Sequence, residues 1–433
     1  MNKRHNHCRF RQISSVRVRF SSAKQLLLVA LSAVSLAVSL AAEAGKLEQA
    51  KRMHERLAGV PPSEEILLQM KTDLDNGDGI AAAMKAMEHD AFYNVTIKNW
   101  AAPWTNREQN VFVPLNDYIA TVVGFVRDSK AFPGDDSAPG KDFRELLYAD
   151  VLYEANSSLG LPAYSTSNNN HYEQLESGGY SLQDNLIERS QSTLTGLPAE
   201  ATAGVVTSRA ASKAFFIAGT NRANFRFTLM NHLCLDLEQV HDVTRVPDRI
   251  RQDVSRSPGG DARVFLNNCI GCHSGMDPMA QAFAYYDYVY DADTDLTGEN
   301  GSLSYNRDGD IDPETESRVK AKYRINSATF PFGYVTPDNH WNNYWREGIN
   351  KNLGWDESLD GAGEGASSML QELAHSQAFA SCQVKKVFKA VCLRDPGDSD
   401  DRGQISSMTD DFKANGYNIK QVWAESANYC KGE

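Results

Sequence analysis

Apolar residues after position 45 recur at spacings of three and four, which is the spacing of one face of a helix. Proline and acidic residues at Pro61-Pro62-Ser63-Glu64-Glu65 are typical of a helix start. The pattern predicts helices with core-facing stripes, with Trp100 and Trp104 in the same core. The stripes are Leu67, Met70 and Leu74; Leu115, Ile119, Val122 and Val126; and Phe143, Leu147 and Val151.

The middle of the chain has weaker periodicity. Residues 156–181 are polar and glycine-rich and predict a long surface loop in which His171 is solvated. Residues 280–290 predict a helix rich in aromatic side chains, and residues 291–338 predict irregular structure with a few short strands.

The last 65 or so residues predict three antiparallel helices, because helical segments there are joined by short loops. The segments are 367–394, with a possible break near Ser376, then 399–414 and 418–430. The fold class is therefore mainly α. The expected organisation is a signal peptide (1–44), a helical N-terminal domain (45–220), a cytochrome c-like haem-binding region (221–293), a loop-rich insert (294–365) and a C-terminal helical domain (366–433).

The first 44 residues differ in kind from the rest. A basic segment precedes an apolar run from Leu26 to Ala42, which ends in the small-x-small sequence Ala42-Glu43-Ala44. The run is nearly long enough for a membrane anchor, but its serines, alanines and cleavage signal favour a signal peptide. We therefore expect a periplasmic or secreted bacterial protein with no stable membrane span after cleavage.

The charge balance argues against nucleic acid as a partner. The formal charge of −12 becomes −18 when residues 1–44, with seven Lys/Arg and one Asp/Glu, are removed (−12 − 7 + 1). Phosphate groups would repel so acidic a chain.

The motif Cys269-Ile270-Gly271-Cys272-His273 carries the chemistry of the chain. Two cysteines three positions apart, followed at once by histidine, are typical of covalent haem attachment. Each sulfur can bond one vinyl carbon of the porphyrin, and the imidazole can ligate the iron. The sequence predicts one haem c, bound by Cys269 and Cys272, with His273 as the proximal iron ligand.

Zinc and dithiol redox chemistry are the rival interpretations of this motif. A zinc site needs a second Cys or His pair at metal spacing, and His232 and His241 are nine residues apart. A thioredoxin-like pair expects a strand-then-helix setting, whereas the surrounding pattern is helical. Both interpretations are therefore disfavoured.

The ligand on the other face of the iron stays open. Met276 and Met279 are close in sequence but would have to reach around the porphyrin ring. Methionine at this position would favour electron transfer, and an open position would favour small-molecule chemistry. The remaining candidates are Met230, His232, His241, His340, Met369 and His375.

Arginines are dense on the approach to the motif, at positions 222, 226, 245, 249, 251, 256 and 263. Arginine binds carboxylates through paired hydrogen bonds, so some of these side chains could hold the haem propionates. An ordinary set of salt bridges explains the cluster equally well.

Four further cysteines predict two disulfides in an exported protein. Cys382 and Cys392 would lie about 15 Å apart along one helix, beyond disulfide reach. Cys234 and Cys430 must therefore each pair with one of them. The expected up-down-up helices favour Cys392–Cys430 and Cys234–Cys382.

Several residues resemble the planctomycete-type cytochrome c family. The haem segment reads Cys-x-x-Cys-His-x-x-x-Asp-Pro from Cys269, followed by Ala282, Tyr286 and Asp287, and the similarity extends over residues 207–430. The C-terminal part contributes Phe379-Ala380-Ser381-Cys382, Lys386 and Arg394, and the chain departs from the family pattern at Ala280, Ala390 and Leu393. The resemblance implies a large exported mono-haem protein, without a substrate.

We expect one-electron transfer with a redox partner protein in the cell envelope. The alternative is an enzyme, a haem-dependent oxidoreductase that acts on an unknown substrate. A third possibility is an envelope binding protein with a structural haem, because a minimal cytochrome domain occupies only about 100 residues.

Overall fold

The computed structural model describes residues 45–129, 140–217, 221–251, 262–324 and 333–432. Residues Lys46–Gly432 form one compact unit. Helices dominate the described chain, and its strands form three two-stranded antiparallel sheets, so the predicted mainly helical class is confirmed. The expected signal peptide lies outside the described residues.

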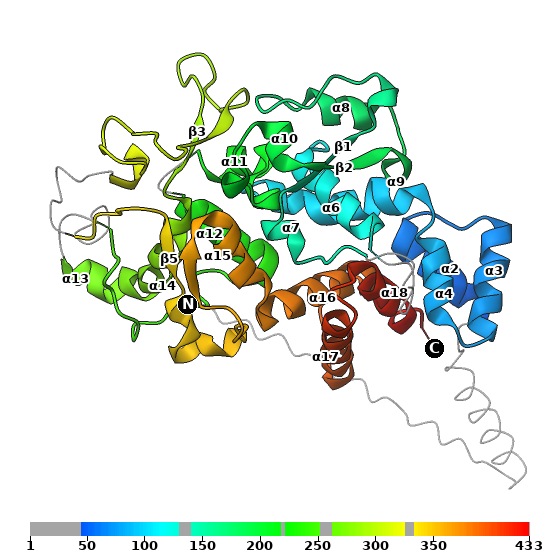
Figure 1. The fold of residues 1–433 in the computed structure, drawn as a ribbon. Coiled ribbons are helices and arrows are strands. Elements are labelled where there is room, and N and C mark those ends of the chain that lie inside the picture. The colour runs from blue at the N-terminus through cyan, green and yellow to red at the C-terminus, as the bar shows by residue number, and fades with distance from the viewer. Residues whose placement is uncertain (1–44, 130–139, 218–220, 252–261, 325–332, 433) are drawn as a thin grey trace, which may run out of the picture. The chain divides into compact units, whose positions relative to one another are not determined.

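Of the first three helices in the described chain, two pack against the last helix and the third packs on those two (Figure 1). Ser63 and Asp78 cap two of them by accepting hydrogen bonds from Ile66 N and Ala81 N. The predicted start near Ser63 is thereby confirmed. These elements are α2 (Lys46–Ala58), α3 (Glu64–Asp75), α4 (Gly79–Ala86) and the final helix α18 (Ile419–Tyr429).

Helix α6 (Asp117–Arg127) is the central element of the core, and Arg127 is its only residue that is not buried. It packs on the strand β1 (Val151–Ala155), which pairs with β2 (Leu186–Ser190). At Gly124 a Cβ atom would lie 2.4 Å from the Tyr153 ring, so only glycine permits this approach.

Short helices connect these layers. The prediction of a long surface loop at 156–181 is wrong in part. The segment contains the helix α8 (Asn170–Ser177), in which His171, Tyr172 and Leu175 are buried. His171 is 5% exposed and bonds Ala155 N and Pro162 O, so it is a structural residue and not a solvated one. The connecting helices are α5 (Lys98–Ala101), α7 (Glu145–Tyr148), α8 (Asn170–Ser177), α9 (Leu182–Asn185), α10 (Gln191–Thr195) and α11 (Arg209–Phe215).

The aromatic segment 280–290 is a helix only as far as Phe283, so the sequence prediction is wrong beyond it. Tyr286–Val289 form strand β3, which pairs with β4 (Ser302–Tyr305). Tyr286 and Tyr288 are buried, whereas Asp287 and Val289 are more exposed. This alternation of every second residue is the period of a strand. Within the described part of 291–338, where a few short strands were predicted, β4 is the one strand.

The C-terminal prediction is confirmed. The helices are α15 (Gly365–Ala374), α16 (Gln377–Cys392), α17 (Ser399–Ala414) and α18. The break falls at Ser376, whose hydroxyl accepts a hydrogen bond from Phe379 N and caps α16. The third sheet, β5 (His340–Asn342) with β6 (Ala362–Glu364), precedes α15.

Two disulfides join Cys234 to Cys382 and Cys392 to Cys430, each with a Cα–Cα distance of 5.4 Å. This is the connectivity that the helix arrangement favoured. The first disulfide joins the segment before the haem motif to α16, and the second joins α16 to the end of α18.

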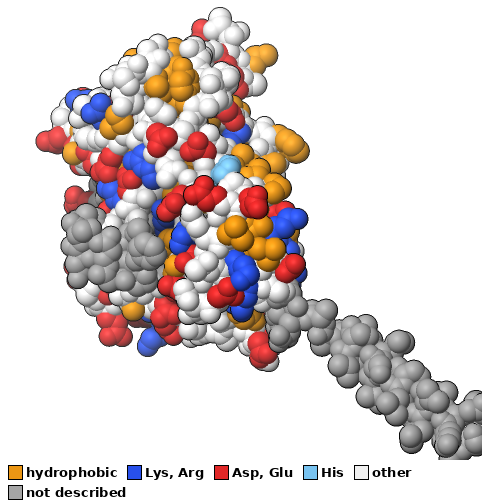
Figure 2. Space-filling model, turned by 90° about the vertical axis from the view of Figure 1, so that its right-hand side faces the viewer, with side chains coloured by type: hydrophobic (Ala, Val, Ile, Leu, Met, Phe, Trp, Pro, Cys, Tyr) orange, Lys and Arg blue, Asp and Glu red, His pale blue; other side chains and the backbone are white. Residues whose placement is uncertain are grey.

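The outer surface carries both signs of charge. Figure 2 shows acidic and basic side chains interspersed over the face it presents. None of the described helices has the length and apolar character needed to cross a bilayer.

The two disulfides should differ in their contribution to stability. They close segments of 148 and 38 residues, so chain entropy predicts losses of about 5 and about 4 kcal/mol in the free energy of unfolding. We expect Cys234→Ala/Cys382→Ala to lower the urea midpoint more than Cys392→Ala/Cys430→Ala. The reverse order would contradict the loop-entropy explanation.

Candidate haem-binding site

The motif lies at the start of helix α14 (Ile270–Ala280). Cys269 precedes the first helical residue, and His273 is in the first turn. Both cysteines are free thiols on partly exposed residues, and the His273 side chain is 18% exposed. The short helix α13 (Ala262–Val264) and a π-helical turn (Phe265–Cys269) precede α14, so the motif is presented by continuous helical backbone.

A buried carboxylate holds His273. Its Nδ1 atom lies 3.1 Å from Oδ1 of Asp277, one helical turn further along α14. Asp277 is in turn bound by Arg222, the first residue of helix α12 (Arg222–Thr228), at 2.7 and 3.0 Å. A carboxylate on Nδ1 fixes the ring orientation and leaves Nε2 for a metal.

Electrostatics keep Asp277 ionised although its side chain is fully buried. Burial alone would raise its pKa, but the charges of Arg222, His273 and Arg251 hold the pKa far below the usual value. Asp277 is therefore a permanent hydrogen-bond acceptor for His273.

The thiol of Cys272 is not activated. Burial raises its pKa, and the negative charges of Glu238 and Asp236 raise it further. Its Sγ atom lies 3.5 Å from the carbonyl oxygen of Leu237. Nucleophilic cysteines have depressed pKa values, so this environment disfavours the dithiol redox interpretation.

Two glycines allow side chains to lie directly on α14. At Gly271 a Cβ would meet the His241 ring at 2.2 Å, and at Gly275 it would meet Trp345 Nε1 at 1.9 Å. Asp242 N donates to the carbonyl of Gly271 at 2.9 Å. The motif helix is thus fixed on the segment that runs from His241 and on Trp345.

Apolar side chains are exposed around the motif. Leu266, three residues before Cys269, is 56% exposed. Val243 is 57% exposed and follows Asp242, whose backbone N–H donates to the carbonyl of Gly271. Ile250, Phe265 and Ile270 form a small cluster against Cys269. Free thiols, an oriented imidazole and exposed apolar side chains together fit a porphyrin, which has an apolar body.

The structure separates the candidates for the other iron ligand. His232 is fully buried and bonded to the Tyr118 hydroxyl at 2.6 Å, and Met369, Met276 and Met279 are core residues. His375 bonds Asp356 at 3.2 Å, away from the motif helix. The partly exposed Met230 lies in a π-helical turn (Leu229–Leu233) that continues α12.

His241 and His340 are candidates on other segments that touch α14. His241 is exposed and lies on Gly271, and His340 begins β5, which packs against α14. The other iron ligand stays a prediction.

The arginine cluster is largely engaged by the protein itself. Arg222 pairs with Asp277, Arg226 with Asp236, and Arg245 with Asp242 and Glu347. For these three arginines the salt-bridge interpretation holds. Arg249 donates to the carbonyl of His340 at 3.0 Å, and Arg256 lies outside the described residues.

Sequence reasoning on its own missed Asp277 as the partner of His273 and Arg222 as the partner of Asp277. The spacing of four between His273 and Asp277 was the available signal, since such residues are neighbours on a helix. The Arg222 contact spans 55 residues and has no local signal.

Comparison with protein-family models, curated proteins and solved structures finds no match. Over the residues that the structure describes, no group of three or more His, Cys, Asp and Glu is arranged to hold a metal ion. A haem iron receives four nitrogens from the porphyrin, so it requires only one or two ligands from the protein.

Gly275→Ala should destabilise the protein. Trp345 is fully buried and cannot move away from the added methyl group, so overpacking should lower the free energy of unfolding by about 1–3 kcal/mol. Gly403→Ala is the matched control, because Gly403 is an exposed helical residue with nothing within 4 Å of its Cβ position. We expect it to stabilise by about 0.5–1 kcal/mol in the same urea titration. Equal stabilities would contradict the close packing at Gly275.

Proposed function

We propose that this chain binds one haem c covalently and transfers single electrons to or from a partner protein in the bacterial cell envelope. The observation that carries the proposal is the combination of two free thiols at Cys269 and Cys272 with His273, whose Nδ1 is held by a buried carboxylate. The resemblance to planctomycete-type cytochromes c supports the same function.

Each residue has a defined task. The S–H bonds of Cys269 and Cys272 would add across the two vinyl groups, sulfur to one carbon and hydrogen to the other. His273 would ligate iron through Nε2, and Asp277 would keep the proton on Nδ1. When bound, haem supplies one-electron chemistry between its ferric and ferrous states.

Exposure at the motif favours electron transfer. Both cysteines are partly exposed, so a porphyrin attached to them is accessible to another protein. The exposed Leu266, Val243 and Val246 offer apolar contact area on the same segments. The two disulfides are typical of an oxidising compartment and support an exported location.

One observation favours a second function, a haem-dependent oxidoreductase. A carboxylate partner raises the basicity of the ligating imidazole, which stabilises higher oxidation states of the iron. A high-spin ferric absorption spectrum that shifts with cyanide or peroxide would support this enzyme. Low-spin bands with a reversible potential would support electron transfer.

Covalent haem attachment should require the motif cysteines. In a host competent for cytochrome c maturation, we expect haem staining after denaturing electrophoresis for the full chain, and none for Cys269→Ala/Cys272→Ala. Cys392→Ala/Cys430→Ala is the matched control, because it also removes two cysteines, here a disulfide pair outside the motif, and should retain the stain. Absence of stain in the unmodified chain would refute the haem assignment.

Asp277→Asn should raise the midpoint potential. The substitution replaces a charge-assisted hydrogen bond to His273 with a neutral one, which reduces donation to the iron and destabilises the ferric state. A difference of about 1 kcal/mol corresponds to a shift of roughly +45 mV for one electron. The shift is measured by spectroelectrochemistry on haem-loaded protein.

Asp236→Asn provides the control for this shift. Asp236 is an ionised carboxylate that pairs with Arg226 and lies close enough to Cys272 to raise its pKa, but it does not bond His273. Its removal should change the potential by less than half as much. Equal shifts in both variants would show that charge alone, and not the bond to His273, sets the potential.

A further inference from the structure

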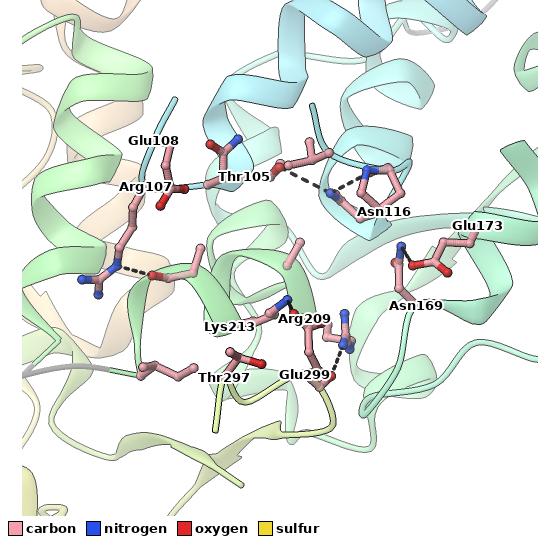
Figure 3. Close-up of a pocket in the computed structure, with 16 residues that line it drawn as sticks. Thr105, Arg107, Glu108, Asn116, Asn169, Glu173, Arg209, Lys213, Thr297 and Glu299 are labelled. Atoms are coloured by element: carbon pink, nitrogen blue, oxygen red, sulfur yellow. Dashed lines mark hydrogen bonds and ion pairs between the residues drawn. The ribbon is translucent and has the colours of Figure 1, made fainter. Parts of the chain in front are cut away.

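A second site lies outside the motif helix. A pocket of about 440 Å³ opens between the segment that contains Thr105 and Arg107, the start of α6, helix α11 and the loop at Thr297–Glu299 (Figure 3). None of the residues that line it belongs to α14 or to the haem motif. Its size is within the usual range for small-molecule sites.

Arg209 and Lys213 face this pocket from one side of α11, because they are four residues apart on a helix. Arg209 is only 8% exposed, and its Nη2 atom donates to the carbonyl of Glu299. Its Nε atom is buried and has no hydrogen-bond partner among the described residues. A buried donor on a charged group is costly when it is left unpaired, which points to a missing acceptor.

Lys213 has only an exchangeable partner. It pairs with the carboxylate of Glu299, whose side chain is 58% exposed, and ion pairs with exposed groups contribute little to stability. An anionic ligand could therefore take the place of Glu299 on Lys213 and pair with the positive charge of the Arg209 guanidinium. The Arg209 guanidinium and the Lys213 ammonium together could bind one carboxylate.

Part of the pocket lining is apolar. Val113, Pro114 and Ile217 belong to it and offer contact to an uncharged body. Glu108 and Glu173 also line the pocket, and they disfavour ligands with several negative charges. The combination selects a monoanion with an apolar or aromatic body over a nucleotide or polyphosphate.

We propose that this pocket binds a small organic monocarboxylic acid. The carboxylate bonds Arg209 and Lys213, and the apolar body lies on Val113, Pro114 and Ile217. The pocket contains no residue of the haem motif, so the result of the binding test does not depend on whether the proposed electron-transfer function is correct.

The probe is 1-naphthoate, titrated calorimetrically into the full-length protein as purified, whether or not it carries haem. We expect a Kd below about 1 mM, which a ligand of this size reaches at ordinary efficiency. The uncharged amide 1-naphthamide has the same shape and should bind about 10-fold more weakly, because it lacks the charge-assisted bonds.

Variants assign the binding to this pocket. Lys213→Gln should weaken 1-naphthoate about 10-fold and leave 1-naphthamide nearly unchanged. Lys71→Gln is the matched control, because Lys71 is also a helical lysine paired with a partly exposed carboxylate, that of Asp75. It should leave both affinities unchanged.

A substitution that fills the pocket tests ligand binding without changing Arg209 or Lys213. Ala214→Trp places a large side chain among the lining residues, and it should abolish binding of 1-naphthoate while unfolding temperature and haem content persist. Absence of binding at 1 mM, equal affinity for the amide, or an unchanged affinity in both Lys213→Gln and Ala214→Trp would overturn the proposal.

Discussion

The buried ion pair between Arg222 and Asp277 is the interaction on which the motif depends. Asp277 has a fully buried side chain, and an ionised carboxylate is stable there only with a paired and hydrogen-bonded partner. Arg222 supplies that partner from α12, and Arg251 lies 4.0 Å away as a second positive charge. The acceptor that orients His273 is thus maintained by residues on two other segments of the chain.

The same region is made rigid by packing. Trp345 and His241 lie on α14 where glycine leaves room for them, and Asn221 donates to the carbonyls of Phe283 and Tyr286, just beyond α14. Arg222 begins a helical segment that ends at Cys234. The Cys234–Cys382 disulfide links this end to α16. These contacts hold the position and orientation of the His273 side chain.

Local patterns predicted much of this protein, and contacts between distant segments account for what was missed. The first two apolar stripes, the break at Ser376 and the disulfides follow from spacing along one helix or between adjacent helices. The third predicted stripe, Phe143, Leu147 and Val151, is wrong, because the helix there spans only Glu145–Tyr148 and Val151 lies in strand β1. The strand at Tyr286–Val289 was missed because aromatic residues suit either period and its partner, residues 302–305, lies across a loop. The burial of His171 and the pocket at Arg209 likewise depend on segments far apart in sequence.

The part of the chain outside the motif helix builds the core on which α14 rests. Phe216, just after α11, packs against Phe283 and Tyr286 with ring centroids 5.4 and 5.8 Å apart, and the Tyr286 hydroxyl donates to the carbonyl of Ala201. Residues Lys46–Gly432 accordingly form one compact unit. Because α11 carries Arg209 and Lys213 and is followed by this aromatic contact, the pocket and the motif helix share one continuous core. Substitutions in that core should therefore be tested for effects on both sites before they are assigned to either.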